Sequence, residues 1–378
     1  MLKHRNNLCR PFRALRVLWG ICTGGFTPGY YITAPLGPER KYLFHKAYSV
    51  LLFLLVTTLC FADFDARKGV IKLMENGGLG KYLAAPVTVS QTDGGALSIR
   101  DEGIFLFQHE LLKPEVSADP NVAIDKCVSI HPKADKMVVV VHGWMDTGTD
   151  AWPSEMAVAI GERTDPNEWV CASYDWRGGS IVMTSIHAAE YARDIAGPRL
   201  AKALLELGTD FKHIHLIGHS AGTWAIHSAA REIAAARPDT QFHLTFLDAY
   251  VPSQWDHDQL GGVYDDRVKQ KSQCWAEQYY TKDITFMVTE HDLKYAHNVD
   301  ISAIDPLISE HEFPYRWYMA TITGQFTRWD EKKEKVHTRC GDINYGFARS
   351  LEAGEKNWIR THKLKTNTPA VKVEKNKK

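Results

Sequence analysis

A serine stands at the centre of the segment Gly218-His219-Ser220-Ala221-Gly222, whose G-x-S-x-G spacing is typical of a tight turn that exposes a serine hydroxyl. Residues 213–217 before it alternate and are apolar enough for a buried strand, and residues 223–236 after it are rich in alanine with helical spacing. The flanking glycines permit a strained backbone and a close approach of helix to strand. The sequence therefore predicts that Ser220 is a nucleophile.

A serine hydroxyl is a weak nucleophile near neutral pH, so it needs a base, an acid that orients the base, and donors for the developing oxyanion. The apolar run 137–141 predicts a strand covered on both faces, and it ends in the turn His142-Gly143-Trp144. Such a turn can direct a backbone N–H group inward. We expect the N–H groups of Trp144 and Ala221 to form the oxyanion hole.

The acid and the base are expected further along the chain. Residues 242–247 predict the next core strand, and Asp248 stands at its carboxyl end, the edge at which catalytic groups of open α/β sheets gather. The chain order Ser, Asp, His favours Asp248 as the acid. The candidate bases among the histidines beyond it are His291, His297, His311 and His337.

The base should lie in a loop after a late strand and shortly before a helix. Residues 284–289 predict the last apolar strand, and His311 precedes Pro314 and a helical stretch over 317–323. The sequence favours His311 as the base. His291 and His297 follow the expected strand more closely and remain alternatives.

Four motifs, in this order and spacing, resemble the pancreatic-type lipase branch of the α/β-hydrolases. They are His142-Gly143-Trp144-Met145-Asp146, Tyr174-Asp175-Trp176-Arg177-Gly178-Gly179-Ser180, Ile217-Gly218-His219-Ser220-Ala221-Gly222 and Phe246-Leu247-Asp248-Ala249. The resemblance covers roughly residues 137–255. It implies an α/β-hydrolase fold, with a mostly parallel, doubly covered sheet and a nucleophile elbow. It also implies a carboxylic ester hydrolase with Ser220, Asp248 and His311 as its triad.

These observations predict an exported serine ester hydrolase, lipase-like or esterase-like, that acts through an acyl-enzyme intermediate on a small-molecule ester or lipid. The alternatives are another acyl hydrolase on the same fold (a phospholipase, thioesterase or amidase) and a non-catalytic lipid-binding protein. Such chemistry needs no organic cofactor and no metal ion. The chain has no CxxC pair, which argues against a zinc site, and no protein partner is expected.

The 378 residues, 44% hydrophobic and 24% charged, have an ordinary globular composition. One catalytic domain over residues 63–362 accounts for them, with a lysine-rich, disordered tail at 363–378. Residues 47–62 form an apolar run, which reads as a secretory signal peptide cleaved after Ala62. Some forty residues precede it, so either translation starts near Leu43 or residues 47–62 are an uncleaved membrane anchor.

Removal of residues 1–62 would leave 37 Lys and Arg against 44 Asp and Glu, a net charge of −7. That balance gives no reason to expect nucleic-acid binding, whereas the basic tail could contribute to peripheral contact with lipid surfaces. Four cysteines would remain, and in an exported protein they could form two disulfides in any of three pairings. They are Cys127, Cys171, Cys274 and Cys340.

The other segments predict the elements around these motifs. Residues 96–99 and 104–107 are expected in the antiparallel edge of the sheet, and residues 188–207 in an amphipathic helix. The segment 250–278 is long, polar and dotted with aromatic residues. It is interpreted either as a lid over the site or as a surface excursion.

Overall fold

The computed structural model of the 378-residue chain is described here for the following residues: 86–101, 119–146, 152–181, 184–255, 260, 273–282, 289, 291–304, 311–327, 333–335, 339–340, 343–344, 346–355 and 371–372. The expected N-terminal extension and signal peptide, 1–62, and the strand expected at 104–107 lie outside these residues. Of the expected tail, Val371 and Lys372 are described.

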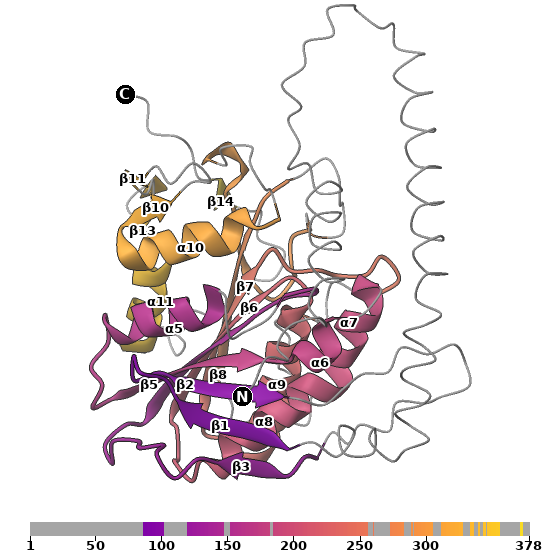
Figure 1. Ribbon diagram of the computed structural model, residues 1–378. Helices are drawn as coiled ribbons and strands as arrows, with labels where there is room; N and C mark the ends of the chain where they lie inside the picture. The colour runs from indigo at the N-terminus through magenta and orange to yellow at the C-terminus, as the bar shows by residue number, and fades with distance from the viewer. Residues whose placement is uncertain are drawn as a thin grey trace, which may run out of the picture. The chain divides into compact units, whose positions relative to one another are not determined.

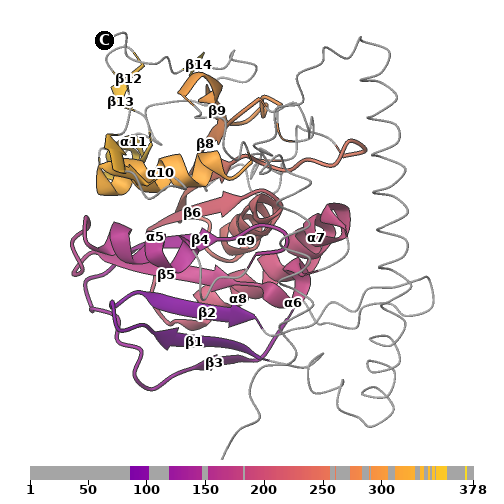
Figure 2. The same cartoon turned by 45° about the horizontal axis from the view of Figure 1, so that its top comes forward.

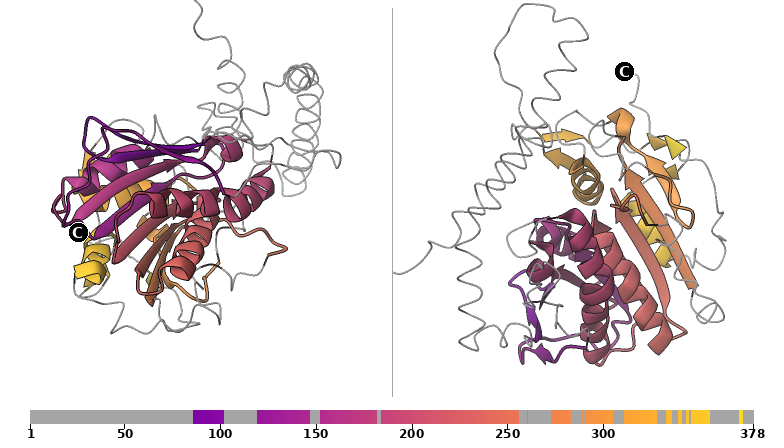
Figure 3. Two further views of the ribbon diagram at one scale, coloured as in Figure 1. Left: turned by 90° about the horizontal axis from the view of Figure 1, so that it is seen from below. Right: turned by 90° about the vertical axis from the view of Figure 1, so that its right-hand side faces the viewer.

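In this part of the chain, ten strands form one sheet in the order β14-β9-β8-β7-β6-β4-β5-β2-β1-β3. Neighbouring strands are parallel, apart from the antiparallel pair β1 and β2. The bounds are β1 Val87–Gln91, β2 Leu97–Asp101, β3 Val122–Ile124, β4 Lys136–Val141, β5 Trp169–Asp175, β6 His213–His219, β7 Gln241–Leu247, β8 Gln273–Tyr280, β9 His297–Asp300 and β14 Val371–Lys372. The edge strands β1, β2 and β3 lie side by side in Figure 2. The strands turn progressively across the sheet, which is the usual twist (Figure 3).

Helices cover both faces of this sheet, as the sequence predicts. Their bounds are α5 Trp152–Gly161, α6 Arg177–Ser180, α7 Ser185–Tyr191, α8 Gly197–Glu206, α9 Gly222–Ala236, α10 Phe313–Thr323 and α11 Phe347–Glu355, with a short 3-10 turn, η2, at Ser302–Ile304. The helices α6 to α9 lie on one side, and α5, α10 and α11 lie on the other (Figure 1). Two small ribbons pair β10 Gln325–Thr327 with β11 Lys333–Lys335, and β12 Arg339–Cys340 with β13 Ile343–Asn344.

The residues of β4 alternate between the two faces. Val139 and Val141 belong to the apolar cluster that contains the buried residues of α8 and α9, whereas Val138 and Val140 belong to the cluster that contains those of α5 and α10. Because both faces are covered, every position of this strand favours an apolar residue. This explains the continuous apolar run 137–141.

The helix expected over 188–207 changes its hydrogen bonding in the middle. α7 is followed by a π-helical turn, η1 Ala192–Ala196, and then by α8. Thr184 caps the start, because its Oγ1 accepts a hydrogen bond from the His187 N–H at 3.3 Å. Gly197 lets α8 lie close to α9, since a Cβ there would be 2.5 Å from the Ser228 Cβ. This packing holds α9, the helix that follows Ser220.

Strand β8 corrects part of the interpretation of residues 250–278. Residues 273–278 belong to an interior strand, buried at 274–278, rather than to a polar lid or surface excursion. Two of its polar side chains are hydrogen-bonded inside the protein: Gln278 Nε2 donates to Asn298 Oδ1 at 3.2 Å, and Glu277 accepts from Thr245 Oγ1 at 2.8 Å. Residues 256–259 and 261–272, and most of the strand expected at 284–289, lie outside the described residues.

The cysteines also correct an expectation. Cys127 and Cys171 carry free thiols, so the four cysteines do not form two disulfides. Cys127 is exposed in the turn after β3, whereas Cys171 is buried in β5 with its Sγ 3.8 Å from Thr164 Oγ1. Burial raises the pKa of the Cys171 thiol to about 11, which keeps it protonated at neutral pH. Among the helices described, none has the length and apolar character needed to cross a membrane.

Candidate active site

Ser220 lies in a sharp turn between β6 and α9, with a backbone φ of 52°. L residues rarely adopt this conformation, so the surrounding contacts must hold it. The Ser220 N–H donates to the Leu247 carbonyl at 3.0 Å, and Thr223 Oγ1 donates to the Ser220 carbonyl at 2.6 Å. The turn also requires glycine at Gly222, because a Cβ there would be 2.2 Å from the carbonyl oxygen of His142. The sequence motif therefore forms a strained strand–turn–helix elbow.

Asp248 directly follows β7 and has a similar backbone conformation, with φ 50°. Its side chain is completely buried. Its N–H donates to the Tyr279 carbonyl at 2.9 Å, and its Oδ1 accepts from the Thr281 N–H at 3.1 Å. Its Oδ2 lies 2.6 Å from Nδ1 of His311. A carboxylate can only accept, so the proton of this pair is assigned to His311 Nδ1, and Nε2 is then the basic atom of the ring.

His311 lies in the turn before α10, and its side chain is 16% exposed. Its carbonyl oxygen accepts a hydrogen bond from His219 Nε2 at 2.9 Å, so the backbone of His311 is tied to the residue that precedes Ser220. Among the described residues, no hydrogen bond joins the Ser220 hydroxyl to His311. Catalytic hydrogen bonds are often long without substrate and tighten in the reacting complex.

The alternative histidines lie in other surroundings. The carbonyl of His291 accepts from Gln278 Nε2 at 2.8 Å. His297 is in β9, and burial together with the nearby Arg349 lowers the pKa of its imidazole to about 4, against the opposing effect of Glu277. His337 lies outside the described residues. Of the histidines described, His311 is the one whose ring is hydrogen-bonded to Asp248.

The residues expected to donate to an oxyanion lie on two sides of Ser220. Ala221 precedes the first residue of α9, and N–H groups at the start of a helix have no acceptor inside it. Trp144 follows Gly143, and a Cβ at Gly143 would be 2.9 Å from the Ser220 Cβ. The turn after β4 therefore approaches Ser220 as closely as a backbone can, which requires glycine at that position.

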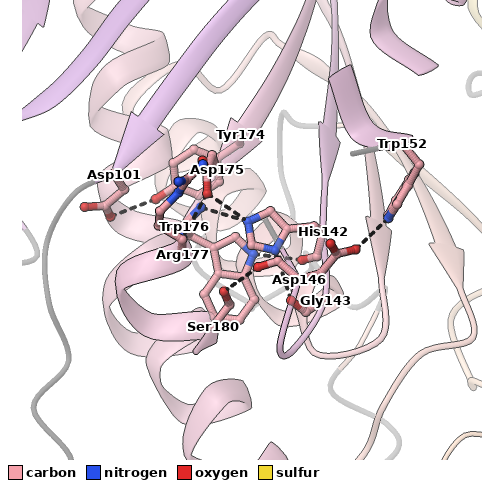
Figure 4. A network of polar contacts seen from close by, with 10 residues as sticks. All are labelled: Asp101, His142, Gly143, Asp146, Trp152, Tyr174, Asp175, Trp176, Arg177 and Ser180. Atoms are coloured by element: carbon pink, nitrogen blue, oxygen red, sulfur yellow. Dashed lines mark hydrogen bonds and ion pairs between the residues drawn. The ribbon is translucent and has the colours of Figure 1, made fainter. Parts of the chain in front are cut away.

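A polar network holds the turn after β4 against the segment that follows β5 (Figure 4). The Trp176 indole N–H donates to the His142 carbonyl at 2.8 Å, and the Trp176 backbone N–H donates to His142 Nε2 at 3.0 Å. Two further bonds involve Ser180: its Oγ donates to the Asp146 carbonyl at 2.9 Å, and its carbonyl accepts from the Met145 N–H at 2.9 Å. The segment 176–180 thus fixes the backbone of 142–146.

Asp175 anchors the other end of this network. Its Oδ1 accepts from the Arg177 backbone N–H at 3.1 Å, and its Oδ2 accepts from Arg177 Nε at 2.7 Å and from the Arg177 Nη2 group. Burial by itself would raise the pKa of Asp175, but His142, whose Nε2 lies 3.3 Å from Oδ1, and the hydrogen bonds from Arg177 outweigh burial and hold that pKa well below its usual range. The Asp-Trp-Arg-Gly-Gly-Ser motif therefore stabilises the turn after β4, which carries the expected oxyanion donor Trp144.

Sequence reasoning assigned no role to two aromatic residues beside the site, Trp152 of α5 and Tyr315 of α10. Their rings stack with centroids 4.4 Å apart, and both meet the His219 ring edge-on. Trp152 Nε1 also donates to Asp146 Oδ2 at 2.8 Å. No local pattern marks these residues, because the cluster forms only when both helices pack on the same face of the sheet.

A second group of titratable residues, His215, His243 and Glu277, lies buried within the sheet and has the composition of a metal site. The two imidazole rings are stacked, with centroids 3.9 Å apart and an interplanar angle of 10°. The Nε2 atoms of both rings already have partners inside the protein, His215 with Thr245 Oγ1 at 2.8 Å and His243 with Glu277 Oε1 at 3.1 Å. Glu277 also accepts hydrogen bonds from Thr245, Tyr279 and Ser350 at 2.6–2.8 Å. We interpret the group as a structural hydrogen-bond network.

This fold, a mostly parallel sheet with helices on both faces, is that of an α/β-hydrolase. Comparison with known proteins agrees, because residues 114–253 match the lipase family model. The chain is 33% identical over 98 residues to pancreatic lipase-related protein 2 of Sus scrofa, which covers 25% of this chain and 20% of that protein. It is 29% identical over 101 residues to the pancreatic triacylglycerol lipase of Cavia porcellus, with 26% and 21% covered. The resemblance to the pancreatic-type lipase branch is thus confirmed over this segment.

The matches span about a fifth of the length of these curated relatives. They include the inactive pancreatic lipase-related protein 1 of Homo sapiens, 33% identical over 87 residues, with 22% of this chain and 18% of that protein covered. The resemblance therefore does not by itself decide whether this chain is catalytically active.

Proposed function

We propose that this protein is a serine carboxylic ester hydrolase, lipase-like or esterase-like. The observation that carries the proposal is the meeting of three features at one edge of the sheet. Ser220 is on a strained elbow, Asp248 is bonded to His311 at 2.6 Å, and the His311 backbone is tied to the residue before Ser220. A nucleophile, a base and an acid that orients the base are the parts that acyl transfer needs.

In the proposed reaction, Nε2 of His311 takes the proton of the Ser220 hydroxyl as its oxygen attacks the ester carbonyl carbon. The buried Asp248 carboxylate keeps the other proton on Nδ1 and stabilises the imidazolium that forms. The N–H groups of Trp144 and Ala221 donate to the oxyanion of the tetrahedral intermediate. The imidazolium then protonates the leaving alkoxide, which departs as an alcohol and leaves an acyl-enzyme.

Water completes the cycle. His311 removes a proton from a water molecule that attacks the acyl carbon, and the second tetrahedral intermediate collapses to a carboxylic acid and the Ser220 hydroxyl. Each half of the cycle returns His311 to its neutral form. All proton transfers are between this ring, Ser220, the ester oxygen and water.

The test is covalent labelling of the protein with a serine-reactive fluorophosphonate, together with turnover of short-chain and long-chain acyl esters. We expect the wild type to label, and Ser220→Ala and His311→Ala to lose labelling and at least about 10³-fold of turnover. Ser253→Ala, a change at an exposed serine in the loop after Asp248, is the matched control and should label as the wild type does. Labelling that persists in Ser220→Ala would mean a different nucleophile.

The same experiment separates the alternatives. Preference for phospholipid, thioester or amide substrates in a panel of acyl donors would identify another acyl hydrolase on this fold. A folded wild-type protein that neither labels nor turns over any ester would favour a non-catalytic lipid-binding role. Acyl-chain length and head group are read from the same panel.

Export is a further part of the proposal. It rests on the apolar run 47–62, which ends in small residues. N-terminal sequencing of the protein secreted or retained by its host is the test. A mature chain that begins at residue 63 supports a cleaved signal peptide, and an intact 47–62 segment in the membrane fraction supports an anchor.

A further inference from the structure

His219 is the residue before the proposed nucleophile, and its side chain is hydrogen-bonded to the backbone of the proposed base. Its Nε2 lies 2.9 Å from the carbonyl oxygen of His311. A carbonyl can only accept, so this nitrogen must carry a proton. Burial, followed by the influence of His311, holds the pKa of His219 well below its usual value. The ring is therefore neutral, with its single proton on Nε2.

The other ring nitrogen has no such bond. Nδ1 of His219 is buried and has no hydrogen-bond partner among the described residues. It faces Gly143, where a Cβ would be 3.0 Å away. A buried polar atom without a partner is unfavourable, so an apolar ring would suit this position better if packing alone decided it. The hydrogen bond from Nε2 to the His311 carbonyl is the contact that an apolar ring could not make at this position.

The neighbours of His219 fix the plane of its ring. The His311 ring lies 4.7 Å away, and the rings of Trp152 and Tyr315 meet it edge-on at 5.9 and 4.9 Å. A ring packed on these sides cannot turn its Nε2–H away from the His311 carbonyl. The donor is thus preorganised.

His311 is consequently held at two points by two adjacent strands. Its side chain bonds to Asp248, which follows the last residue of β7, and its backbone carbonyl bonds to His219, the last residue of β6. Those strand ends are in register, since His219 pairs with Leu247. One bond sets the tautomer and tilt of the ring, and the other sets the backbone from which the ring projects.

We propose that His219 is a positioning residue, whose neutral Nε2–H group fixes the backbone of His311 so that its ring is presented to Ser220. The inference rests on the proposed function and adds to it a residue that does not touch substrate. Loss of the bond should lower the rate of serine acylation while substrate binding stays unchanged.

The test compares His219→Phe, which keeps a ring but removes the donor, with His219→Gln, whose side-chain amide can donate from a similar place. We expect His219→Phe to lower kcat and the fluorophosphonate labelling rate about 10- to 100-fold with KM within about twofold, because small displacements of a catalytic group cost this much. His219→Gln should recover most of that loss. Equal kcat in His219→Phe and wild type, or equal losses in both variants, would overturn the proposal.

His213→Phe is the matched control. His213 lies at the other end of the same strand, and its ring nitrogens are also buried without partners among the described residues. This variant should alter thermal stability and leave kcat as in the wild type. A wild type that fails to label at all would count against the proposed function. The hydrogen bond of His219 is then tested by the spectroscopic measurement below, which does not depend on activity.

A spectroscopic measurement does not depend on the stability of any variant. In protein labelled with ¹⁵N-histidine, we expect His219, assigned by the signal lost in His219→Gln, to be the neutral Nε2–H tautomer from pH 5 to 8. An Nδ1–H tautomer, or an imidazolium in this range, would show that the bond to the His311 carbonyl is absent and would overturn the proposal.

Discussion

At the scale of single residues, the site depends on two unusual features of the backbone. Two residues have a conformation that L residues rarely adopt, and one turn lies so close to Ser220 that a side chain would not fit between them. Ser220 and Asp248 have φ values of 52° and 50°, and each is the first residue after a parallel strand. Positive φ in a residue with a Cβ costs of order 1–3 kcal/mol. Hydrogen bonds to Leu247 and Tyr279 stabilise the two turns, so strain at one strand end is offset by bonds to its neighbours.

Gly143 is the residue at which this crowding can be tested. In Gly143→Ala, the new Cβ would be 2.9 Å from the Ser220 Cβ and 3.0 Å from His219 Nδ1, so the turn must move away from the elbow. We expect kcat to fall about 10- to 100-fold, because a proposed oxyanion donor follows directly in the chain. Ester turnover and urea unfolding measure the two effects.

Gly161→Ala, at the end of α5, is the control for this change. Among the described residues its Cβ would meet only Cys171 Sγ, at 3.9 Å, an ordinary contact. Its kcat should equal that of the wild type. Full activity in Gly143→Ala would contradict the view that the turn must approach Ser220 closely.

At the scale of elements, the segment that follows β5 stabilises the turn that follows β4. Trp176 is completely buried, and its ring stacks on His142 with centroids 5.4 Å apart. Its indole N–H provides the hydrogen bond to the His142 carbonyl. The elbow, which requires Gly222 beside that same carbonyl, is therefore coupled to β5 through His142.

Trp176→Phe keeps an aromatic ring and removes this donor. A buried carbonyl that loses its partner costs about 1–3 kcal/mol, so the free energy of unfolding should fall by at least that amount. We also expect kcat to fall about tenfold, because the turn that carries Trp144 is less fixed. Urea unfolding and ester turnover are the measurements. The same change at Trp169, at the start of β5, should affect stability alone; parallel losses of kcat in both variants would refute the coupling.

The elements show where sequence reasoning succeeds and where it fails. β4, β6 and β7 could be predicted because each is an apolar segment ending in a motif with its own geometry, and α9 because the elbow demands a helix. β8 could not, because Glu277 and Gln278 look exposed in sequence but are buried and hydrogen-bonded to distant partners such as Ser350 and Asn298. The aromatic contacts of His219 were hidden for the same reason. Local patterns do not record partners that only the fold brings together.

At the scale of the whole molecule, the core contains a set of histidines that folding keeps neutral. Burial is the main cause, and nearby cations add to it for some members. Burial and Lys136 lower the pKa of His213 to about 4, and burial and Arg231 lower that of His227 to about 3. The pKa values of His215, His219 and His243 are also well below the ordinary value.

These shifts predict that the protein loses stability in mild acid. An unfolded chain binds a proton on each histidine below its ordinary pKa of 6.5, whereas the folded protein binds none at these sites until the pH is near the lowered values. The unfolded state then holds more protons than the folded state. The contribution of these histidines to the free energy of unfolding is therefore present in full above pH 6.5 and is lost as the pH falls from 6.5 to about 4. Each group contributes a loss of about 1.4 kcal/mol by pH 5.5. Urea unfolding at pH 7.5, 6.5 and 5.5 measures it.

His227→Phe isolates one proton of this set, since His227 lies in α9 and makes an edge contact with Trp224 rather than a hydrogen bond at Nδ1. Between pH 7.5 and 5.5, the free energy of unfolding of the variant should fall by about 1.4 kcal/mol less than that of the wild type, because the unfolded variant no longer gains that proton. Ser253→Ala, which removes no titratable group, should keep the wild-type difference between these pH values. If His227→Phe and the wild type lost stability in parallel, His227 would have to titrate alike in the folded and unfolded states, and burial would not be what keeps this histidine neutral.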